Sequence, residues 1–328
     1  MRSKMPREQT LPALLRIVTL ALSLAAALNA QAQQPIDESR AVTPNERIFI
    51  DVRRGEVRIR ATDEGIFRVR GTLDEDAQGH ALESSRGFTR FEVEMPRSAG
   101  GWAEGDTARV SDLDIELPAG STLEFQGVNT TVIVTGITGG SQISSVNGRI
   151  EASNLSERVD LSTVNGSILS AGNSGRVTLR SVNGEIEDTG SSGRIEYDSV
   201  NGNIRAQSRA SEVQAGTVNG DVDLTLAGTT ELSVNTVNGD FTIRLADSSS
   251  PRIEGNSVTG DLALVLDPAL DVRVALQTRG GDIQNELSDT SVEEERFGPR
   301  KSLQLSLGDG KGMIELQSIS GDLSLTLP

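Results

Sequence analysis

The sequence predicts an all-β protein, a single-stranded β-solenoid with coils of about 18 residues and a cap of β-strands at its N-terminal side. The first observation is the triplet Val-Asn-Gly, which returns every eighteen residues over most of the repeats. The second is a weaker half-period of nine, in which a glycine turn precedes a short run of alternating residues. The third is that aliphatic residues recur at the same position of successive coils. Complete triplets begin at Val146, Val164, Val182, Val200, Val218 and Val237.

The alternation within each coil predicts which side chains fill the interior. We expect three aliphatic columns to face inward. They are Ile150, Ile168, Ile186, Ile204 and Val222; Val159, Val177, Ile195 and Val213; and Val146, Val164, Val182, Val200 and Val218. Tyr197 stands where Leu161 and Leu179 stand in earlier coils, so we expect its side chain in the core as well.

Residues 1–32 have the composition of a secretory signal peptide. Basic residues precede a short apolar run from Ile17 to Leu28, and Ala30-Gln31-Ala32 offers a cleavage site of the small-x-small type. The run is short for a membrane-spanning helix, and a retained N-terminal anchor is the alternative. We therefore expect an extracytoplasmic protein, periplasmic or secreted to the cell surface, with no transmembrane span after cleavage.

Periodicity and composition divide the remaining chain into five segments. Residues 33–46 are polar with two prolines, and we expect a flexible leader there. Residues 47–122 contain short alternating runs separated by turns, which predict a strand meander that caps the solenoid. The regular β-solenoid repeats span 123–284, an acidic loop insertion without periodicity spans 285–300, and a C-terminal coil or cap spans 301–328.

Composition argues against several classes of function. The net charge is −16, and removal of the basic segment 1–32 would leave −19, so the surface disfavours nucleic acid and anionic membranes but permits cations, basic partners and neutral glycans. His80, in an expected loop over residues 72–88, is the single histidine, which argues against a histidine metal site or a catalytic triad. The chain has no cysteine, so its stability must come from packing and backbone hydrogen bonds.

A family resemblance rests on several of these features together. The strand meander, the Leu-Pro-x-Gly turn at Leu117–Gly120, the Val-Asn-Gly-x-Ile coils and the closing Ser-Gly-Asp-Leu at Ser320–Leu323 resemble the bacterial putative-adhesin family of secreted β-solenoid proteins, a domain of unknown function. The resemblance covers residues 46–328. It implies a β-solenoid in an extracytoplasmic setting and brings no catalytic residues.

The Asn and Gly of each triplet are candidate site residues. Stacked Asn amides can hydrogen-bond along the rod, and Asn tolerates the turn conformations found next to glycine. We interpret these residues as a structural turn ladder, with a polar strip that contacts glycans as the alternative. The ladder comprises Asn147, Gly148, Asn165, Gly166, Asn183, Gly184, Asn201, Gly202, Asn219, Gly220, Asn238 and Gly239.

An aspartate follows the turn glycine in four later repeats. Stacked carboxylates about 5 Å apart repel one another. A bound cation could offset this repulsion, and calcium, which prefers oxygen ligands, is the one cofactor that the sequence suggests. The alternative is that each Asp accepts a hydrogen bond from turn backbone. The column comprises Asp221, Asp240, Asp261 and Asp282.

The only tryptophan, Trp102, follows Gly100-Gly101 in an expected loop. An exposed indole could contact a ligand by stacking on a sugar or anchoring a partner. The alternative is that Trp102 folds back over the open end of the solenoid core.

These features favour a non-enzymatic, adhesin-like binding scaffold of the cell envelope or surface, which presents a rigid face to a glycan, an envelope component or a protein. Copies could also associate through the solenoid ends. One alternative is a polysaccharide-active β-helix enzyme, and the other is a purely structural envelope spacer. The candidate catalytic residues of the enzyme are Glu187, Glu196 and Arg205, or Asp221 and Asp223, scattered along the repeats.

Overall fold

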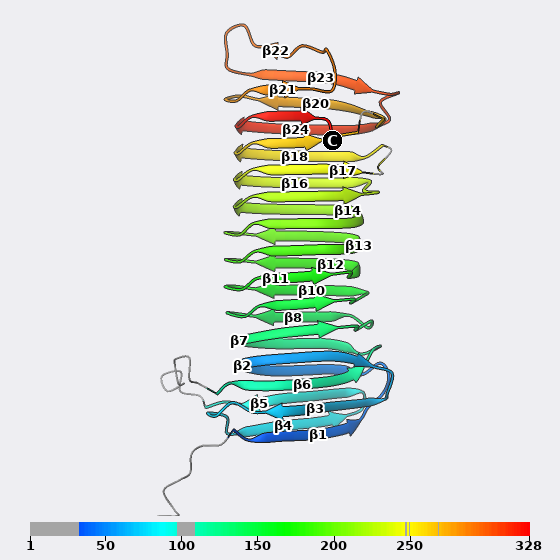
Figure 1. Ribbon diagram of the computed structural model, residues 1–328, viewed down its shortest axis with the longest axis vertical. Coiled ribbons are helices and arrows are strands. Elements are labelled where there is room, and N and C mark those ends of the chain that lie inside the picture. The colour runs from blue at the N-terminus through cyan, green and yellow to red at the C-terminus, as the bar shows by residue number, and fades with distance from the viewer. Residues whose placement is uncertain (1–32, 97–108, 247, 249, 268) are drawn as a thin grey trace, which may run out of the picture.

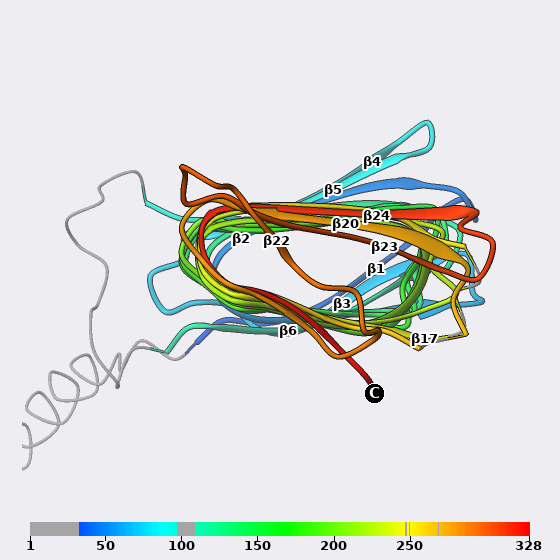
Figure 2. The same ribbon diagram turned by 90° about the horizontal axis from the view of Figure 1, so that it is seen from above.

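The protein is described here by a computed structural model that covers residues 33–96, 109–246, 248, 250–267 and 269–328. Every regular element of these residues is a β-strand, and hydrogen bonds join the strands into one sheet. The sheet winds into a rod whose strands stack along its length (Figure 1). Seen along the rod axis, two opposed layers enclose a flattened interior (Figure 2).

The strands vary in length because some of them run through both layers. In chain order the first are β1 (Pro35–Ala41), β2 (Arg47–Thr62), β3 (Ile66–Thr72), β4 (Gly79–Ser85), β5 (Phe88–Glu94), β6 (Ser111–Pro118) and β7 (Thr122–Thr135). The middle strands are β8 (Ser141–Ser145), β9 (Ile150–Ser153), β10 (Arg158–Thr163), β11 (Ile168–Ala171), β12 (Ser174–Ser181), β13 (Ile186–Ser199), β14 (Ile204–Asn219), β15 (Val222–Ala227), β16 (Glu231–Asn238) and β17 (Phe241–Ala246). The last are β18 (Arg252–Thr259), β19 (Leu262–Val265), β20 (Val272–Thr278), β21 (Ile283–Asn285), β22 (Glu293–Glu294), β23 (Lys301–Leu307), β24 (Gly312–Ser320) and β25 (Leu323–Thr326).

Equivalent residues of neighbouring repeats lie directly opposite one another. Ile168 pairs with Ile150 on one side and Ile186 on the other, in parallel strands. All three side chains are fully buried, because alternation points them inward and the strand spacing of ~4.8 Å lets each one cover the next. Tyr197 is fully buried too, as expected. The all-β, solenoid-like architecture predicted from the repeats is therefore present.

The glycine of each triplet is selected by the close approach of successive turns. A Cβ atom on Gly166, Gly184 or Gly202 would collide with the carbonyl oxygen of the glycine one coil earlier. None of these three glycines has a positive φ, so the contact, and not a left-handed backbone, requires glycine. A buried hydroxyl three residues before the glycine often donates to the same carbonyl, as Ser181 Oγ does to the Gly166 oxygen at 3.2 Å.

The exposure of the valine column corrects our expectation that it faces inward. These valines are 38–41% exposed, and Ile319 in the equivalent place is 54% exposed. The reason is parity, since Val159, Leu161 and Thr163 occupy the inward positions of one strand and Val164 follows on the opposite parity. The exposed members are Val146, Val164, Val182, Val200, Val218, Val237 and Val258, and we call them, with Ile319, the valine row.

The N-terminal part is built into the rod more closely than we predicted. The expected flexible leader 33–46 contains β1, which pairs antiparallel with β3 and buries Ile36. The expected loop around His80 contains β4, which pairs with β5. β2 pairs in parallel with β5, β6 and β7, so the cap continues the stack without a break. Backbone pairing and one buried isoleucine thus order a segment whose composition resembles a linker.

A buried ion pair joins β2 to the segment that follows β3. Arg54 is 7% exposed and donates from Nε and Nη2 to the two carboxylate oxygens of Asp74, at 2.6 and 2.8 Å. Asp76 accepts a further hydrogen bond from Nη2 at 3.0 Å. The hydrogen bonds to Asp74 raise the pKa of Arg54 by more than burial lowers it, so the guanidinium is charged. Two desolvated charges therefore depend on each other here.

The last segment of the chain does not end the rod, contrary to the expected terminal cap over 301–328. β24 lies between β18 and β20, in parallel with both, and β25 lies between β19 and β21. Figure 1 accordingly marks the C-terminus below the end of the stack. The sequence Ser318-Ile319-Ser320-Gly321-Asp322 keeps the pattern of 257–261, so it continues that repeat better than 278–282 does.

The acidic insertion 285–300 lies at the end of the rod beyond β20. Its first residue, Asn285, ends β21, and within it β22 pairs antiparallel with β23, which pairs antiparallel with β20. Most side chains of this segment are exposed. An antiparallel strand with a charged neighbour therefore closes the end that a further parallel coil would extend.

We predict that Gly184→Ala lowers the free energy of unfolding by about 1–3 kcal/mol, because the new Cβ must push two turns apart. Gly216→Ala is the matched control, since the nearest atom to its Cβ is Asp198 Oδ1 at 3.4 Å. Urea denaturation of both variants checks this. An equal loss in the two variants would contradict the role given to turn contact.

We predict that Asp74→Ala costs about 3–5 kcal/mol of unfolding free energy, because it leaves the Arg54 guanidinium buried without its main partner. Glu151→Ala removes the carboxylate of an exposed pair with Arg149 and should cost at most about 1 kcal/mol. Thermal and urea unfolding of the two variants measure the difference. Similar losses would show that the buried pair is not critical.

Candidate functional site

The Asn residues of the triplets form one continuous hydrogen-bonded ladder along the rod. In each step the side-chain Nδ2 of one Asn donates to Oδ1 of the Asn in the preceding coil, at 2.7–3.0 Å. The side chains are exposed, so each amide keeps hydrogen-bonding capacity toward solvent. The members from the N-terminal side are Asn129, Asn147, Asn165, Asn183, Asn201, Asn219 and Asn238.

The aspartates after the turn glycines form a second ladder, in which a carboxylate meets a backbone amide. The N–H of Asp240 donates to Asp221 Oδ1 at 3.1 Å, and the N–H of Asp261 donates to Asp240 Oδ1 at 2.9 Å. Asp322 follows Asp261 and precedes Asp282, because its coil is inserted there. Each of these hydrogen bonds supplies a donor that offsets the repulsion between neighbouring carboxylates.

The ladder accounts for the aspartate column without a cation. Within the described ranges, no three His, Cys, Asp or Glu residues are arranged to hold a metal ion. At the end of the column Lys301 Nζ contacts Asp282 and lies 3.4 Å from Glu294 Oε1. Calcium binding by these aspartates stays a prediction.

The candidate catalytic residues are only partly brought together. Glu187, Arg205 and Asp223 stand in one column of outward side chains beside a hollow of about 380 Å³. Two are engaged in ion pairs, Asp223 with Arg244 at 2.6 Å and Arg205 with Glu185. Glu196 is in the other layer and pairs with Arg180, while Asp221 belongs to the aspartate ladder. The arrangement resembles paired surface charges more than a convergent acid and base.

Besides the Arg54–Asp74 pair, the interior holds a carboxylate that the sequence analysis did not single out. Asp188 is 2% exposed and accepts hydrogen bonds from Ser191 Oγ at 2.6 Å and from Tyr197 Oη at 2.7 Å. Burial raises the pKa of Asp188, while hydrogen bonds from Ser170, Ser191 and Tyr197 act in the opposite direction. Burial, followed by the charge of Asp188, raises the pKa of Tyr197. The side-chain oxygens of Asp188 are therefore engaged by hydroxyl groups of the core.

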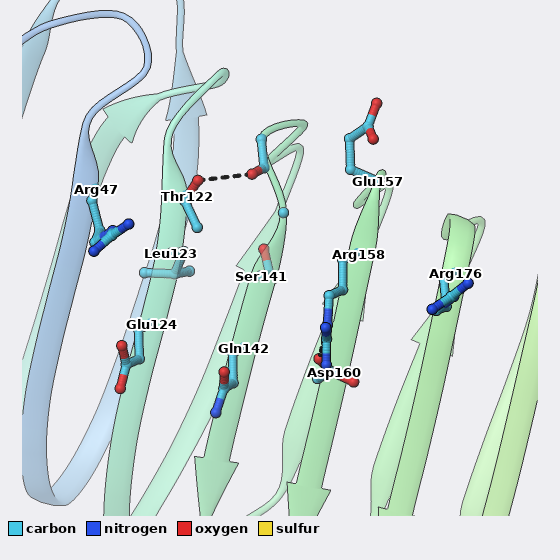
Figure 3. A pocket seen from close by; sticks show the side chains of 12 residues that line it. Arg47, Thr122, Leu123, Glu124, Ser141, Gln142, Glu157, Arg158, Asp160 and Arg176 are labelled. Atoms are coloured by element: carbon cyan, nitrogen blue, oxygen red, sulfur yellow. Dashed lines mark hydrogen bonds and ion pairs between the residues drawn. The ribbon is translucent and has the colours of Figure 1, made fainter.

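A polar opening lies where β2, β7, β8, β10 and β12 pass side by side. It is a hollow of about 420 Å³, and we call it the arginine hollow. Figure 3 shows arginine, glutamate, glutamine and aspartate side chains on neighbouring strands. Its polar lining consists of Arg47, Thr122, Glu124, Ser141, Gln142, Glu157, Arg158, Asp160 and Arg176.

Sequence reasoning missed both the arginine hollow and the valine row. The hollow joins Arg47 to Arg176, which are far apart in the chain, so only the stacking order of β2 reveals it. The valine row could have been found from the period-two parity within each repeat. A second hollow, of about 460 Å³, lies beside Val146, Val164, Val182 and Val200.

Trp102 and the expected signal peptide 1–32 lie outside the described residues. Both therefore stay predictions. Over the described residues, no helix has the length and apolar character needed to cross a membrane.

We predict that Asp188→Asn gains stability relative to the natural protein as pH rises above about 4. A folded-state pKa above the ordinary value of 3.8 means that the unfolded carboxyl ionises first, so the natural protein loses stability from there until the raised pKa is passed. Below pH 3.8 the carboxyl is protonated in both the folded and the unfolded natural protein, so it gives stability no pH dependence there. Urea denaturation of both proteins between pH 4 and pH 8 measures the difference, and a difference independent of pH would contradict the prediction.

Solved structures similar to this chain share little sequence with it. No curated protein matches the sequence significantly. One similar solved structure is a putative cell adhesion protein from Clostridium sporogenes ATCC 15579, with 14% identity, 90% of this chain and 100% of that chain covered, and a TM-score of 0.24. Another is a putative lipid binding protein from Parabacteroides distasonis ATCC 8503, with 14% identity, 71% and 97% coverage, and a TM-score of 0.46. With TM-scores below 0.5, neither supports an inference about this chain.

The family comparison covers most of the sequence. The family model described as Toastrack DUF4097 matches residues 45–326, from the first long strand through the inserted C-terminal coil. This match confirms the resemblance to a β-solenoid family of unknown function that the Val-Asn-Gly coils indicate. The chain belongs to the Toastrack DUF4097 family.

Proposed function

We propose that this protein is a non-enzymatic, extracytoplasmic binding scaffold that presents one rigid face to a component of the cell envelope. The proposal is supported by the leader-like composition of residues 1–32. The partner would be a glycan, another envelope component or a protein. A rod of stacked coils suits this task because its outward residues can vary while its backbone stays fixed.

The observation that carries the proposal is the valine row. Eight aliphatic side chains, each 38–54% exposed, recur in successive coils beside the uncharged Asn ladder. Exposed apolar residues that are contiguous over a long distance mark interaction surfaces more often than scattered ones do. The adjoining hollow gives a partner space between Val146 and Val200. A structural spacer would not need an apolar strip of this length.

The test is co-sedimentation of the purified protein with outer membrane, peptidoglycan and whole-cell fractions. We expect saturable binding to one fraction, with an affinity at least about tenfold lower in the variant Val164→Thr, Val182→Thr, Val200→Thr. Threonine keeps the β-branched shape at these exposed positions and removes apolar surface. The control Leu169→Thr changes a half-buried residue on β11 of the other layer and should bind normally.

Three results would contradict the proposal. They are an absence of saturable binding to every fraction, equal losses in the valine variant and the control, and release of reducing sugars from envelope glycans. The last would favour the polysaccharide-active enzyme, whose candidate residues Glu187, Arg205 and Asp223 share one column.

A further inference from the structure

The arginine hollow contains two guanidinium groups without a partner among the described residues. Arg47 and Arg176 are exposed and make no side-chain hydrogen bond or ion pair there. Other arginines of this layer are neutralised, Arg158 by Asp160 at 2.6 Å and Arg180 by Glu196 at 2.7 Å. Two unpaired guanidinium groups at one opening favour an anionic ligand group.

Strand register places these cations along a line parallel to the rod. Arg47 lies opposite Thr122, and Arg158 lies opposite Arg176. Gly140 takes the place between Thr122 and Arg158, because Leu123 pairs with Ser141 and Ser141 with Val159. Four strand spacings of ~4.8 Å separate Arg47 from Arg176, so their Cα atoms are about 19 Å apart along the rod axis. An extended ligand is therefore needed to reach both.

Glycine opens the hollow between the arginines. Gly139 and Gly140 carry no side chain at the point where neighbouring strands carry Thr122 and Arg158. Thr122 Oγ1 donates to the Gly139 carbonyl oxygen at 2.9 Å, which holds this bend in place (Figure 3). Ser141, the next residue, pairs with the fully buried Leu123 and Val159, so its side chain faces the core and not the hollow.

The other polar groups limit which anion fits. Glu124, Glu157 and Asp160 line the same hollow and would repel a densely charged polymer such as nucleic acid. The same carboxylates, with the Gln142 amide, can accept hydrogen bonds from hydroxyl groups. A ligand that combines many hydroxyls with occasional carboxylates satisfies both sets of groups, and guanidinium matches carboxylate geometry.

We propose that the arginine hollow binds an acidic glycan, a sugar chain carrying carboxylates, laid along the rod from Arg47 to Arg176. This inference rests on the proposed binding function and names the ligand class for one surface. The guanidinium groups of Arg47 and Arg176 bind carboxylates at the two ends of the segment. Glu124, Gln142 and Asp160 accept hydrogen bonds from the sugar hydroxyls between them.

Calorimetric titration with a galacturonate oligomer tests the proposal, with the methyl-esterified oligomer as the uncharged match. We expect saturable binding that weakens with salt, and at least about tenfold weaker binding of the ester. The double variant Arg47→Gln, Arg176→Gln should show a similar loss. The exposed Arg209 on β14 lies outside the hollow, so Arg209→Gln should bind normally.

The proposal is overturned if the oligomer gives no saturable heat, if the ester binds equally well, or if Arg209→Gln loses as much affinity as the double variant. The ester comparison needs no variant, so a folding defect in the double variant would not obscure the result. If the natural protein co-sediments with an envelope fraction but does not bind the oligomer, only this inference is overturned. If it co-sediments with no envelope fraction, the proposed function is overturned.

Discussion

The contact between successive turn glycines is the constraint on which the rest of the structure depends. It permits one coil to follow the next at the strand spacing of ~4.8 Å, because the carbonyl oxygen of one glycine occupies the space where a Cβ would stand in the next. Parallel pairing at that distance then places equivalent residues opposite each other. The buried aliphatic columns, the Asn ladder and the valine row are all consequences of this one register.

Stacking like on like is favourable for isoleucine and asparagine but costly for charges, and the chain deals with this in two ways. In one column the signs alternate, with Arg205 between Glu187 and Asp223. In the aspartate ladder the charges are equal, and a backbone N–H from the next coil binds each carboxylate except the last, Asp282, which Lys301 contacts. Arg158 and Arg176 are aligned like charges, and only Arg158 is neutralised, by Asp160. The charge that this leaves on Arg176 is the reason for proposing a binding site at the arginine hollow.

The sequence predicted features that repeat locally and missed those that depend on chain order. The Asn ladder and the buried columns could be predicted because each coil contains the whole pattern. The valine row needed only stricter attention to parity. The position of β24 between β18 and β20 could not be read from periodicity, since the chain passes through β20 first. The arginine hollow was hidden for the same reason, because β2 and β12 line one opening only when β7, β8 and β10 stack between them.

The ends of the rod bear on whether copies associate there. Parallel coils could in principle add without limit, since each presents unpaired backbone groups to the next. At one end β23 reverses direction on β20 and carries β22, whose residues are Glu293 and Glu294. At the other end β1 pairs with β3 only among the described strands, and its sequence, PIDESRA, begins with proline and is rich in charge. Reversed strands, proline and exposed charges all oppose further pairing, so the architecture favours a rod of fixed length whose side faces carry its function.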